Sequence, residues 1–233
     1  MISDAFIEAG HLLVRLDADL MEILILSIQV SAVSLLISVV IGLPVGAVLA
    51  MNAFPGRHIA VTVLNALMGL PPVVVGLLVY LMLSRSGPLG VLGLLYTPTA
   101  MVIAQVVLIT PIIGALSCQV IEDLHHEYEA QFRSFSVPRT TAVCAYLWDA
   151  RYSLMTTILA GFGRAISEVG AVIIVGGNID HLTRVMTTAI ALETSKGELA
   201  VALALGIILL SLALVVNAVV MMLRTQAKRM GYV

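Results

Sequence analysis

Charged residues are scarce in this sequence, and cysteines are almost absent. Asp, Glu, Lys and Arg make up 11% of the 233 residues, while 60% are hydrophobic. A typical globular chain has about 25% charged residues, so the composition is that of a membrane protein. The formal net charge is -2 without a basic block, which gives no support to a nucleic acid partner. Two cysteines, Cys118 and Cys144, are too few for a disulfide framework or a CxxC metal site.

Motifs of enzyme active sites are also missing from the chain. It contains no Gly-x-x-x-x-Gly-Lys-Ser/Thr phosphate loop, no HExxH and no GxSxG. We therefore expect a protein that is not an enzyme, does not hydrolyse ATP itself and needs no cofactor. His125 and His126 precede Glu127, but adjacent residues on a helix point in different directions, which argues against a metal site.

Long runs without Asp, Glu, Lys or Arg are abundant, and one helical crossing of a membrane needs about 20 such residues. Four runs are free of these residues, and a fifth is interrupted only by Arg164 and Glu168. In chain order the five are Ile23–Gly56, His58–Ser84, Ser86–Ile121, Tyr152–Val175 and Leu199–Leu223. Backbone groups in lipid need partners within their own segment, so the sequence predicts an all-α membrane protein with about five transmembrane helices.

Prolines and glycines accompany the first three predicted spans. Kinks are expected at the prolines, because a packed membrane helix tolerates them; these are Pro44, Pro71, Pro72, Pro98 and Pro111. Gly42 and Gly46 flank Pro44 and form a small-residue face on which another helix can approach closely. We expect this face to serve helix packing rather than gating.

The distribution of Lys and Arg predicts the orientation, because the cytoplasmic side carries the surplus. With the N-terminus outside and the C-terminus cytoplasmic, seven basic residues lie inside: Arg57, Arg133, Arg139, Arg151, Arg224, Lys228 and Arg229. Four lie outside: Arg15, Arg85, Arg184 and Lys196. Residues 1–21 place polar side chains about 3.6 residues apart, which indicates an amphipathic helix. It lies along the outer membrane face or extends the first span.

Residues 122–151 form a polar segment between the third and fourth spans. It carries almost a third of all charges together with Phe132, Phe135, Tyr146 and Trp148, which exceeds what a simple turn requires. Mixed charges and aromatic residues suit a protein partner, so we interpret this segment as a cytoplasmic docking loop.

The most specific signal is the run Gly161–Ala171, followed by Gly176, Gly177, Asn178 and Ile179. This run resembles the oxyanion branch of the ABC importer permeases, which take up molybdate, sulfate or tungstate. The paired glycines before Asn178, with the later Met186–Ile190, are most similar to tungstate permeases. The resemblance implies a single permease domain over residues 1–233 with a type I importer fold, in a bacterial or archaeal plasma membrane. It also implies a homodimer, partner ATPase subunits and an external oxyanion-binding protein.

The same resemblance assigns a role to segment 122–151. These permeases carry there Glu-Ala-Ala, three residues, Gly, nine residues and Ile-x-Leu-Pro, on a coupling helix that seats in a groove of the ATPase. Glu129, Ala130 and Leu147 agree with the pattern, whereas Gln131, Phe135, Ala145 and Trp148 depart from it. By position, Glu129 and Ala130, with Arg133 and Leu147, are the expected ATPase-coupling residues.

Arg164 and Glu168 are four residues apart, so they share one side of a helix and can form an ion pair. An unpaired charge near the bilayer centre costs about 2.5 to 3.5 kcal/mol, so this span faces the bundle interior or an aqueous cavity. The pair either stabilises the helix bundle or contributes to the transport path or its gate, and we favour the structural role. Residues 178–198 are expected to form an external loop. There Arg184 and Lys196 either meet the binding protein or are simply solvated.

Two other function classes remain open. An ion-gradient-driven secondary transporter commonly shows inverted repeats and several intramembrane carboxylates, whereas this chain shows no duplicated half and only Glu168 in a span. A non-transporting membrane anchor of a complex leaves the run around Arg164 unexplained. Neighbouring genes for an ATPase and a secreted binding protein would distinguish the importer from both.

Overall fold

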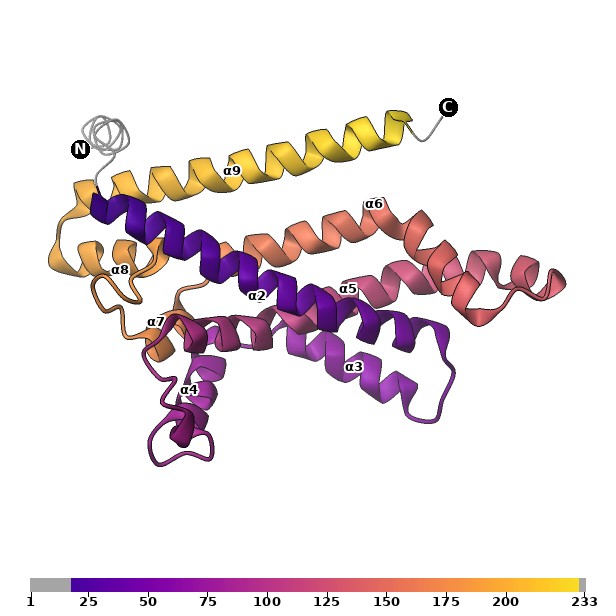
Figure 1. The fold of residues 1–233 in the computed structure, drawn as a ribbon, viewed down its shortest axis with the longest axis horizontal. Helices are drawn as coiled ribbons and strands as arrows, with labels where there is room; N and C mark the ends of the chain where they lie inside the picture. Colours follow the sequence, from indigo (N-terminus) through magenta and orange to yellow (C-terminus); the bar gives the residue numbers. More distant parts are fainter. Residues whose placement is uncertain (1–17, 231–233) are drawn as a thin grey trace.

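The structure, a computed structural model, describes residues 18–230, and the side chains of residues 139, 140 and 223–230 are not described. All regular elements in this range are helical. They are α2 (Ala18–Met51), α3 (Arg57–Met68), α4 (Pro72–Leu83), the 3-10 turn η1 (Gly90–Leu92), α5 (Pro98–Ser134), α6 (Arg139–Ile166), α7 (Gly170–Gly176), α8 (Met186–Lys196) and α9 (Leu199–Met230). Helices α2, α5, α6 and α9 run along the long axis, with α8 at one end and the α5–α6 hairpin at the other (Figure 1).

Three helices are long and apolar enough to cross a membrane, namely α2, α5 and the part of α9 from Leu199 to Met222. Two bent helix pairs, α3 with α4 and α6 with α7, raise the number to five if each pair counts as one span. The expected all-helical architecture is therefore confirmed. The expected five crossings correspond to the larger of these two numbers.

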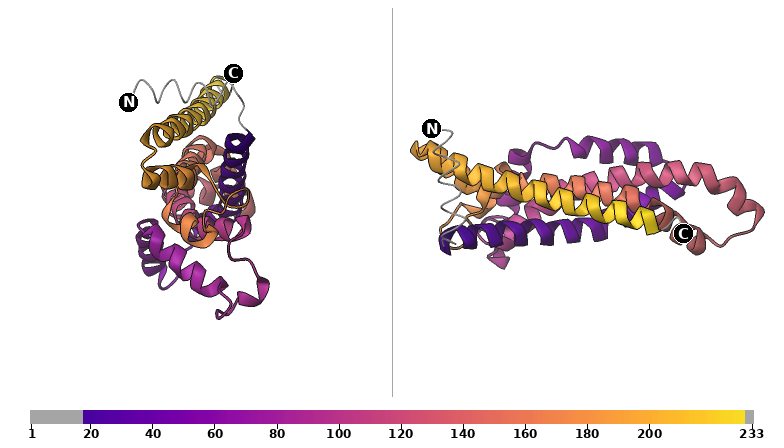
Figure 2. Two further views of the ribbon diagram at one scale, coloured as in Figure 1. Left: turned by 90° about the vertical axis from the view of Figure 1, so that its left-hand side faces the viewer. Right: turned by 90° about the horizontal axis from the view of Figure 1, so that it is seen from above.

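The second predicted span, His58–Ser84, is wrong as a single helix. Its two halves, α3 and α4, meet at 100°, and α4 projects from the side of the bundle (Figure 2). Pro72 is the first residue of α4, and Pro71 before it has an extended backbone with φ -65° and ψ 123°. A proline disfavours helical geometry in the residue that precedes it, so the Pro71-Pro72 pair ends one helix and begins the next.

The third predicted span, Ser86–Ile121, is misplaced at both ends. Residues 86–97 form a loop with η1, and α5 begins at Pro98 and continues to Ser134. The side-chain oxygen of Thr97 caps α5 by accepting the N–H of Ala100 at 3.4 Å, and Pro98 stands at the first helical position, where no N–H is needed. A cap and a proline together fix the start of α5 twelve residues later than the charge pattern suggests.

Helices α2 and α5 pack with almost no space between their backbones. A Cβ atom added at Gly42 would lie 2.9 Å from Cβ of Ile113, and one at Gly46 would lie 2.6 Å from the carbonyl oxygen of Gly114. The predicted small-residue face is thus confirmed as a helix-packing face. Pro44 and Pro111 lie within α2 and α5, and both helices continue past them.

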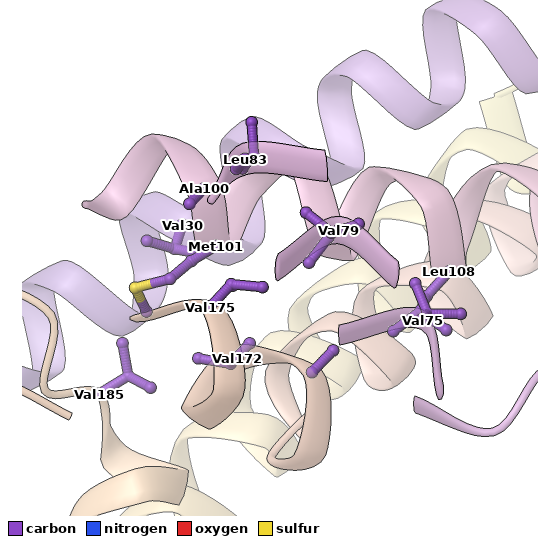
Figure 3. Close-up of a cluster of buried hydrophobic side chains, with 12 residues drawn as sticks. Val30, Val75, Val79, Leu83, Ala100, Met101, Leu108, Val172, Val175 and Val185 are labelled. Carbon is purple, nitrogen blue, oxygen red and sulfur yellow. The ribbon is translucent and has the colours of Figure 1, made fainter. Parts of the chain in front are cut away.

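The largest buried apolar cluster joins α4, α5 and α7 (Figure 3). Its members include Val75 and Val79 of α4, Met101 of α5, and Val172 and Val175 of α7. Lipid tails are as apolar as these side chains, so burial contributes little to association in a membrane, and close packing and hydrogen bonds must hold the helices together. Glycine permits that packing, since a Cβ at Gly76 would lie 2.7 Å from Cα of Ala171.

Both polar segments that we expected as loops are largely helical. Segment 122–151 comprises the end of α5, a short turn at residues 135–138 and the start of α6. Segment 178–198 contains a turn followed by α8, whose buried residues include Met186, Thr187 and Thr188. Of the predicted amphipathic helix 1–21, residues 1–17 lie outside the described residues, and residues 18–21 begin α2.

Candidate functional site

The predicted fourth span, Tyr152–Val175, is interrupted by a break in the helix. Helix α6 ends at Ile166 and α7 begins at Gly170, and their axes differ by 54°. Glu168 lies within the break with 3% of its side chain exposed. Its Oε1 accepts the backbone N–H of Ala171 at 3.2 Å. Free N–H groups at a helix start need acceptors, so Glu168 caps α7.

The predicted ion pair between Arg164 and Glu168 is confirmed. An Nη atom of Arg164 lies 3.4 Å from Oε2 of Glu168, longer than the roughly 2.7–2.9 Å of a strong charge-assisted hydrogen bond. Arg164 is 33% exposed, in contrast to its buried partner. A guanidinium has five N–H donors, so the pair neutralises Glu168 and leaves Arg164 with donors that face outward.

Polar side chains from two other helices bond to the backbone of this break, and a third helix bonds to the start of α8 beside it. Thr187 of α8 donates to the carbonyl of Glu168 at 2.8 Å, and Gln105 of α5 donates to the carbonyl of Ala165 at 3.1 Å. Ser27 of α2 accepts the N–H of Met186, at the start of α8, at 2.8 Å. Broken helices are tolerated in membranes only where neighbours satisfy the freed backbone groups, and these bonds meet that requirement.

Sequence reasoning missed Gln105, Thr187 and the serines of α2. The signal was present, because serines recur at positions 27, 31, 34 and 38, all buried on one face of α2. Gln105 is likewise a lone amide within an apolar stretch of α5. Buried polar groups need partners, so both features could have indicated a polar contact inside the bundle.

One exposed face of α6 is polar, which we call the α6 stripe: Ser153, Thr156, Ala160, Gly163, Arg164 and Ser167. Four of these residues are exposed, and Gly163 and Arg164 are partly exposed. The exposed faces of α2 and α9 are mostly apolar, for example at Leu36 and Val40 on α2 and at Leu210 and Leu214 on α9. Because lipid solvates hydroxyl and guanidinium groups poorly, the α6 stripe requires water or protein beside it.

The chemistry of the α6 stripe suits an anion. An open groove of about 350 Å³ adjoins the N-terminal half of the stripe. Its lining includes Ser153, Thr156 and the amide of Gln119 on α5. The hydroxyl of Thr156 bonds to the carbonyl of Tyr152 at 3.3 Å and that of Ser167 to the carbonyl of Arg164 at 3.2 Å, and both can rotate toward a ligand. From Ser153 to Ser167 the stripe has donors and a cation but no carboxylate, since Glu168 is turned inward.

The hairpin of α5 and α6 is stiffened by aromatic side chains. Tyr146 is buried there and bonds to Nδ1 of His125 at 3.0 Å. Its ring stacks on Tyr128 with centroids 6.5 Å apart and lies 5.3 Å from Phe132. Ring contacts of this kind add stabilisation beyond the buried area, so the two helix ends form one rigid projection.

Beside this projection lies an open groove of about 1090 Å³, bounded by the end of α2, the start of α3 and the hairpin. Arg57 joins its walls, because its Nη2 lies 2.7 Å from Glu122 on α5 and its Nε donates to the carbonyl of Leu49 on α2 at 2.7 Å. Glu129 and Arg133 line the groove and form an ion pair at 2.7 Å.

The structure brings together only two of the four expected ATPase-coupling residues. Glu129 and Arg133 share the groove, whereas its lining includes neither Ala130 nor Leu147. Ala130 is exposed on α5, and Leu147 is exposed on α6 beside Trp148. The four residues thus belong to one rigid hairpin but occupy different faces of it.

At the opposite end, both expected docking cations have an intramolecular partner. Arg184 bonds to Asp180 at 2.6 Å, and Lys196 bonds to Glu193 at 2.7 Å. His181 bonds to Glu22 of α2 at 2.8 Å. That hydrogen bond, with the charge of Asp180, raises the pKa of His181 above its ordinary value. Any partner that binds Arg184 or Lys196 must compete with these carboxylates.

In the part of the chain that the structure describes, no group of three or more His, Cys, Asp or Glu side chains is arranged to hold a metal ion. Nδ1 of His125 faces the hydroxyl of Tyr146, and Nε2 of His126 lies 3.9 Å from Glu122. The adjacent histidines therefore face different partners.

Comparison with known proteins gives consistent matches along almost the whole chain. The sequence profile of a family described as "Binding-protein-dependent transport system inner membrane component" matches residues 42–229. A probable anion ABC transporter permease protein of Haloferax volcanii is 40% identical over 204 residues, covering 85% of this chain and 88% of that protein. The tungstate uptake system permease protein TupB of Peptoclostridium acidaminophilum is 38% identical, covering 97% and 99%. The TupB protein of Campylobacter jejuni is 33% identical, covering 93% and 90%.

Proposed function

The chain belongs to the family of binding-protein-dependent transport system inner membrane components, and we propose that it forms the membrane path of an ATP-driven importer for tungstate or a related oxyanion such as molybdate. Its relatives identify it as a multi-pass ABC transporter permease of the oxyanion family, a transport component rather than an enzyme. The family implies ATPase subunits and a substrate-binding protein as partners.

The α6 stripe is the observation that carries this proposal. A polar helix face with a cation and no exposed carboxylate is costly beside lipid and suited to a passing anion. Within residues 18–230 of one copy, Ser153, Thr156, Ala160 and Ser167 of the stripe are exposed, so the other side of such a path is open there. We therefore propose a homodimer about a two-fold axis, in which the α6 stripes of two copies face one another across an aqueous path.

Arg164 is expected to bind the transported oxyanion weakly rather than tightly. Glu168 neutralises part of its charge at 3.4 Å, and a permease must release its cargo after each cycle. High affinity and selection between oxyanions then belong to the external binding protein. Tungstate and molybdate are nearly equal in size and charge, so the choice of tungstate rests on the two TupB relatives.

The proposed orientation places the α5–α6 hairpin in the cytoplasm and α8 outside. The basic residues support it, since the hairpin and the end of α9 carry six of the twelve Lys and Arg residues. Glu129, Ala130, Arg133 and Leu147 then meet the ATPase subunits. The segment with Arg184 and Lys196 meets the binding protein, and the competing ion pairs favour a short-lived contact. The membrane is the plasma (inner) membrane of a bacterium or archaeon.

Family membership favours this function over both alternatives. A secondary transporter would use an ion gradient and no ATPase, and a membrane anchor would carry no oxyanion. The polar α6 stripe also argues against the anchor, because an anchor gains nothing from a hydroxyl-lined face in lipid.

Uptake by purified components tests the proposal. The chain is reconstituted in liposomes with its co-encoded ATPase and binding protein, and entry of tungstate, molybdate and sulfate is followed with and without internal ATP. We expect accumulation only with ATP and both partners. Accumulation by the chain alone under an ion gradient would establish the secondary transporter. If the full complex takes up none of the three anions, with or without ATP, the result would support the membrane anchor.

A further inference from the structure

Gln105 links three helices inside the bundle. It belongs to α5 and is 4% exposed. Its Nε2 donates to the backbone carbonyl of Ala165, at the end of α6, at 3.1 Å. Its Oε1 lies 2.6 Å from the hydroxyl of Ser34 on α2. One side chain therefore fixes the last turn of α6 against both α2 and α5.

The orientation of this amide follows from its partners. A backbone carbonyl only accepts, so the NH₂ group must face Ala165 and the oxygen must face Ser34. Ser34 is then the donor, although its single hydrogen also has the carbonyl of Val30 within reach at 2.7 Å. The carbonyl of Ser31 is a third acceptor at 3.1 Å, and the contact from Ser34 to Gln105, at 2.6 Å, is the shortest of the three.

Hydrogen bonds hold the α6–α7 break at this point in addition to packing, since Ala165 also lies in a buried cluster with Ile109 and Ile113 of α5. A small internal cavity of about 10 Å³ adjoins Gln105, lined also by Ser31, Glu168 and Thr187 among others, and a space of this size holds about one water molecule. The carbonyl of Ala165 also accepts the N–H of Glu168, at 3.4 Å. The donor from Gln105 is the shorter of the two.

We propose that Gln105 is a positioning residue for transport: it sets the angle of the α6–α7 break and thereby holds Arg164, the neighbour of Ala165, on the α6 stripe. This inference rests on the proposed function, because Arg164 must line the path for its position to matter. Gln105 does not touch the anion path itself. It acts through the end of α6, where a displaced Ala165 carries Arg164 with it.

Two substitutions separate positioning from folding. Gln105→Leu has a similar size and no hydrogen-bonding groups, so it leaves the carbonyl of Ala165 without its shorter bond. Gln105→Glu keeps the shape, and a buried carboxyl is protonated well above its ordinary pKa. In that form it donates to Ala165 and accepts from Ser34, as the amide does, whereas the ionised form cannot donate.

The readout is the number of anions transported per ATP hydrolysed, measured in the complete complex. For Gln105→Leu we expect this ratio to fall roughly tenfold, because the buried carbonyl of Ala165 loses the shorter of its hydrogen bonds. For Gln105→Glu we expect a ratio near that of the wild type at about pH 6, falling as the pH rises to about 9. Leu205→Ala, which truncates a buried side chain in the cluster of α8 and α9, controls for lost stability alone.

Unchanged transport per ATP in Gln105→Leu, with only a lower melting temperature, would overturn the inference, and so would a Gln105→Glu ratio that is independent of pH. Hydrogen exchange of residues 163–172 gives a second measure that needs no transport. We expect faster exchange there in Gln105→Leu than in the wild type, and equal exchange would overturn the inference. If the wild-type complex moves no oxyanion, the proposed function fails, and hydrogen exchange still decides whether Gln105 holds the break.

Discussion

Arg164 and Glu168 form an ion pair whose two partners differ in their surroundings: 33% of the Arg164 side chain is exposed, against 3% of Glu168. The carboxylate is held from two sides, since Oε2 faces Arg164 and Oε1 caps α7 through Ala171. The guanidinium is held from one side only. The pair therefore has a buried partner that caps α7 and a partly exposed partner, while its role in the path stays a prediction.

This asymmetry predicts the stability of variants at the pair. Arg164→Ala strands a buried carboxylate, and breaking a fully buried pair costs about 3–5 kcal/mol; we expect a smaller loss because Arg164 is partly exposed. Adding Glu168→Gln should recover much of it, since a neutral amide oxygen can still cap α7. Thermal unfolding in detergent measures both variants. Arg133→Ala is the matched control, because its pair with Glu129 is exposed and worth little. Equal melting of single and double variants would contradict the pairing.

A second prediction concerns the hairpin. Glu129→Arg reverses the charge in the groove and removes the ion pair with Arg133, so we expect ATP hydrolysis to continue while transport per ATP falls several-fold, as expected for loss of a charged contact. Glu127→Arg, an exposed neighbour that does not line the groove, should leave the ratio near that of the wild type. Normal coupled uptake by the Glu129 variant would remove this residue from the ATPase contact.

Helix packing gives a third prediction. A Cβ at Gly46 would lie 2.6 Å from the carbonyl oxygen of Gly114 and 2.9 Å from the backbone nitrogen of Cys118. Gly46→Ala must therefore push α2 away from α5, and overpacking typically costs about 1–3 kcal/mol. Gly206→Ala on α9 meets nothing within 4 Å and should be neutral or slightly stabilising. Detergent melts compare the two, and equal melting temperatures would contradict the close approach.

The contact between His181 and Glu22 predicts a pH dependence. The hydrogen bond to Glu22 raises the pKa of His181 from its ordinary value of 6.5. A raised folded-state pKa contributes stability that is complete below the unfolded-state value and is lost as the pH rises through the folded-state value. We expect wild-type melting to exceed that of His181→Gln at about pH 6 and to converge with it at alkaline pH. A constant difference across this range would show that protonation of His181 plays no part.

Much of the fold follows from the sequence, because lipid demands continuous apolar helices. The charge-free runs locate α2, α5 and α9, and the spacing of Arg164 and Glu168 predicts their pair. The break before Pro72 also follows from the sequence, because the Pro71-Pro72 pair causes it locally. The second break, after Ile166, is different, because it depends on partners distant in sequence. Gln105 and Thr187 satisfy the second break, and no local pattern at residues 167–169 reveals them.

The polar segments show the opposite error. Charges in segments 122–151 and 178–198 suggested loops, yet the first is two helix ends and the second contains α8. Polar residues end a membrane span without ending the helix. Their side chains form hydrogen bonds with water, and the backbone keeps its hydrogen bonds within the helix. The roles of Glu129, Ala130, Arg133, Leu147, Arg184 and Lys196 stay predictions, because they require partner proteins.

Water access to the α6 stripe tests the central claim most directly. In a variant with Cys118 and Cys144 replaced by serine, single cysteines are placed at Thr156 on the stripe and at Val40 on the apolar face of α2. The assembled complex is treated with a negatively charged, membrane-impermeant thiol reagent, which reacts only with a hydrated thiolate. We predict that the cysteine at position 156 is labelled, that its labelling is slower during tungstate transport, and that the cysteine at position 40 is not labelled. Equal protection of both positions in every state of the transport cycle would contradict an anion path along α6.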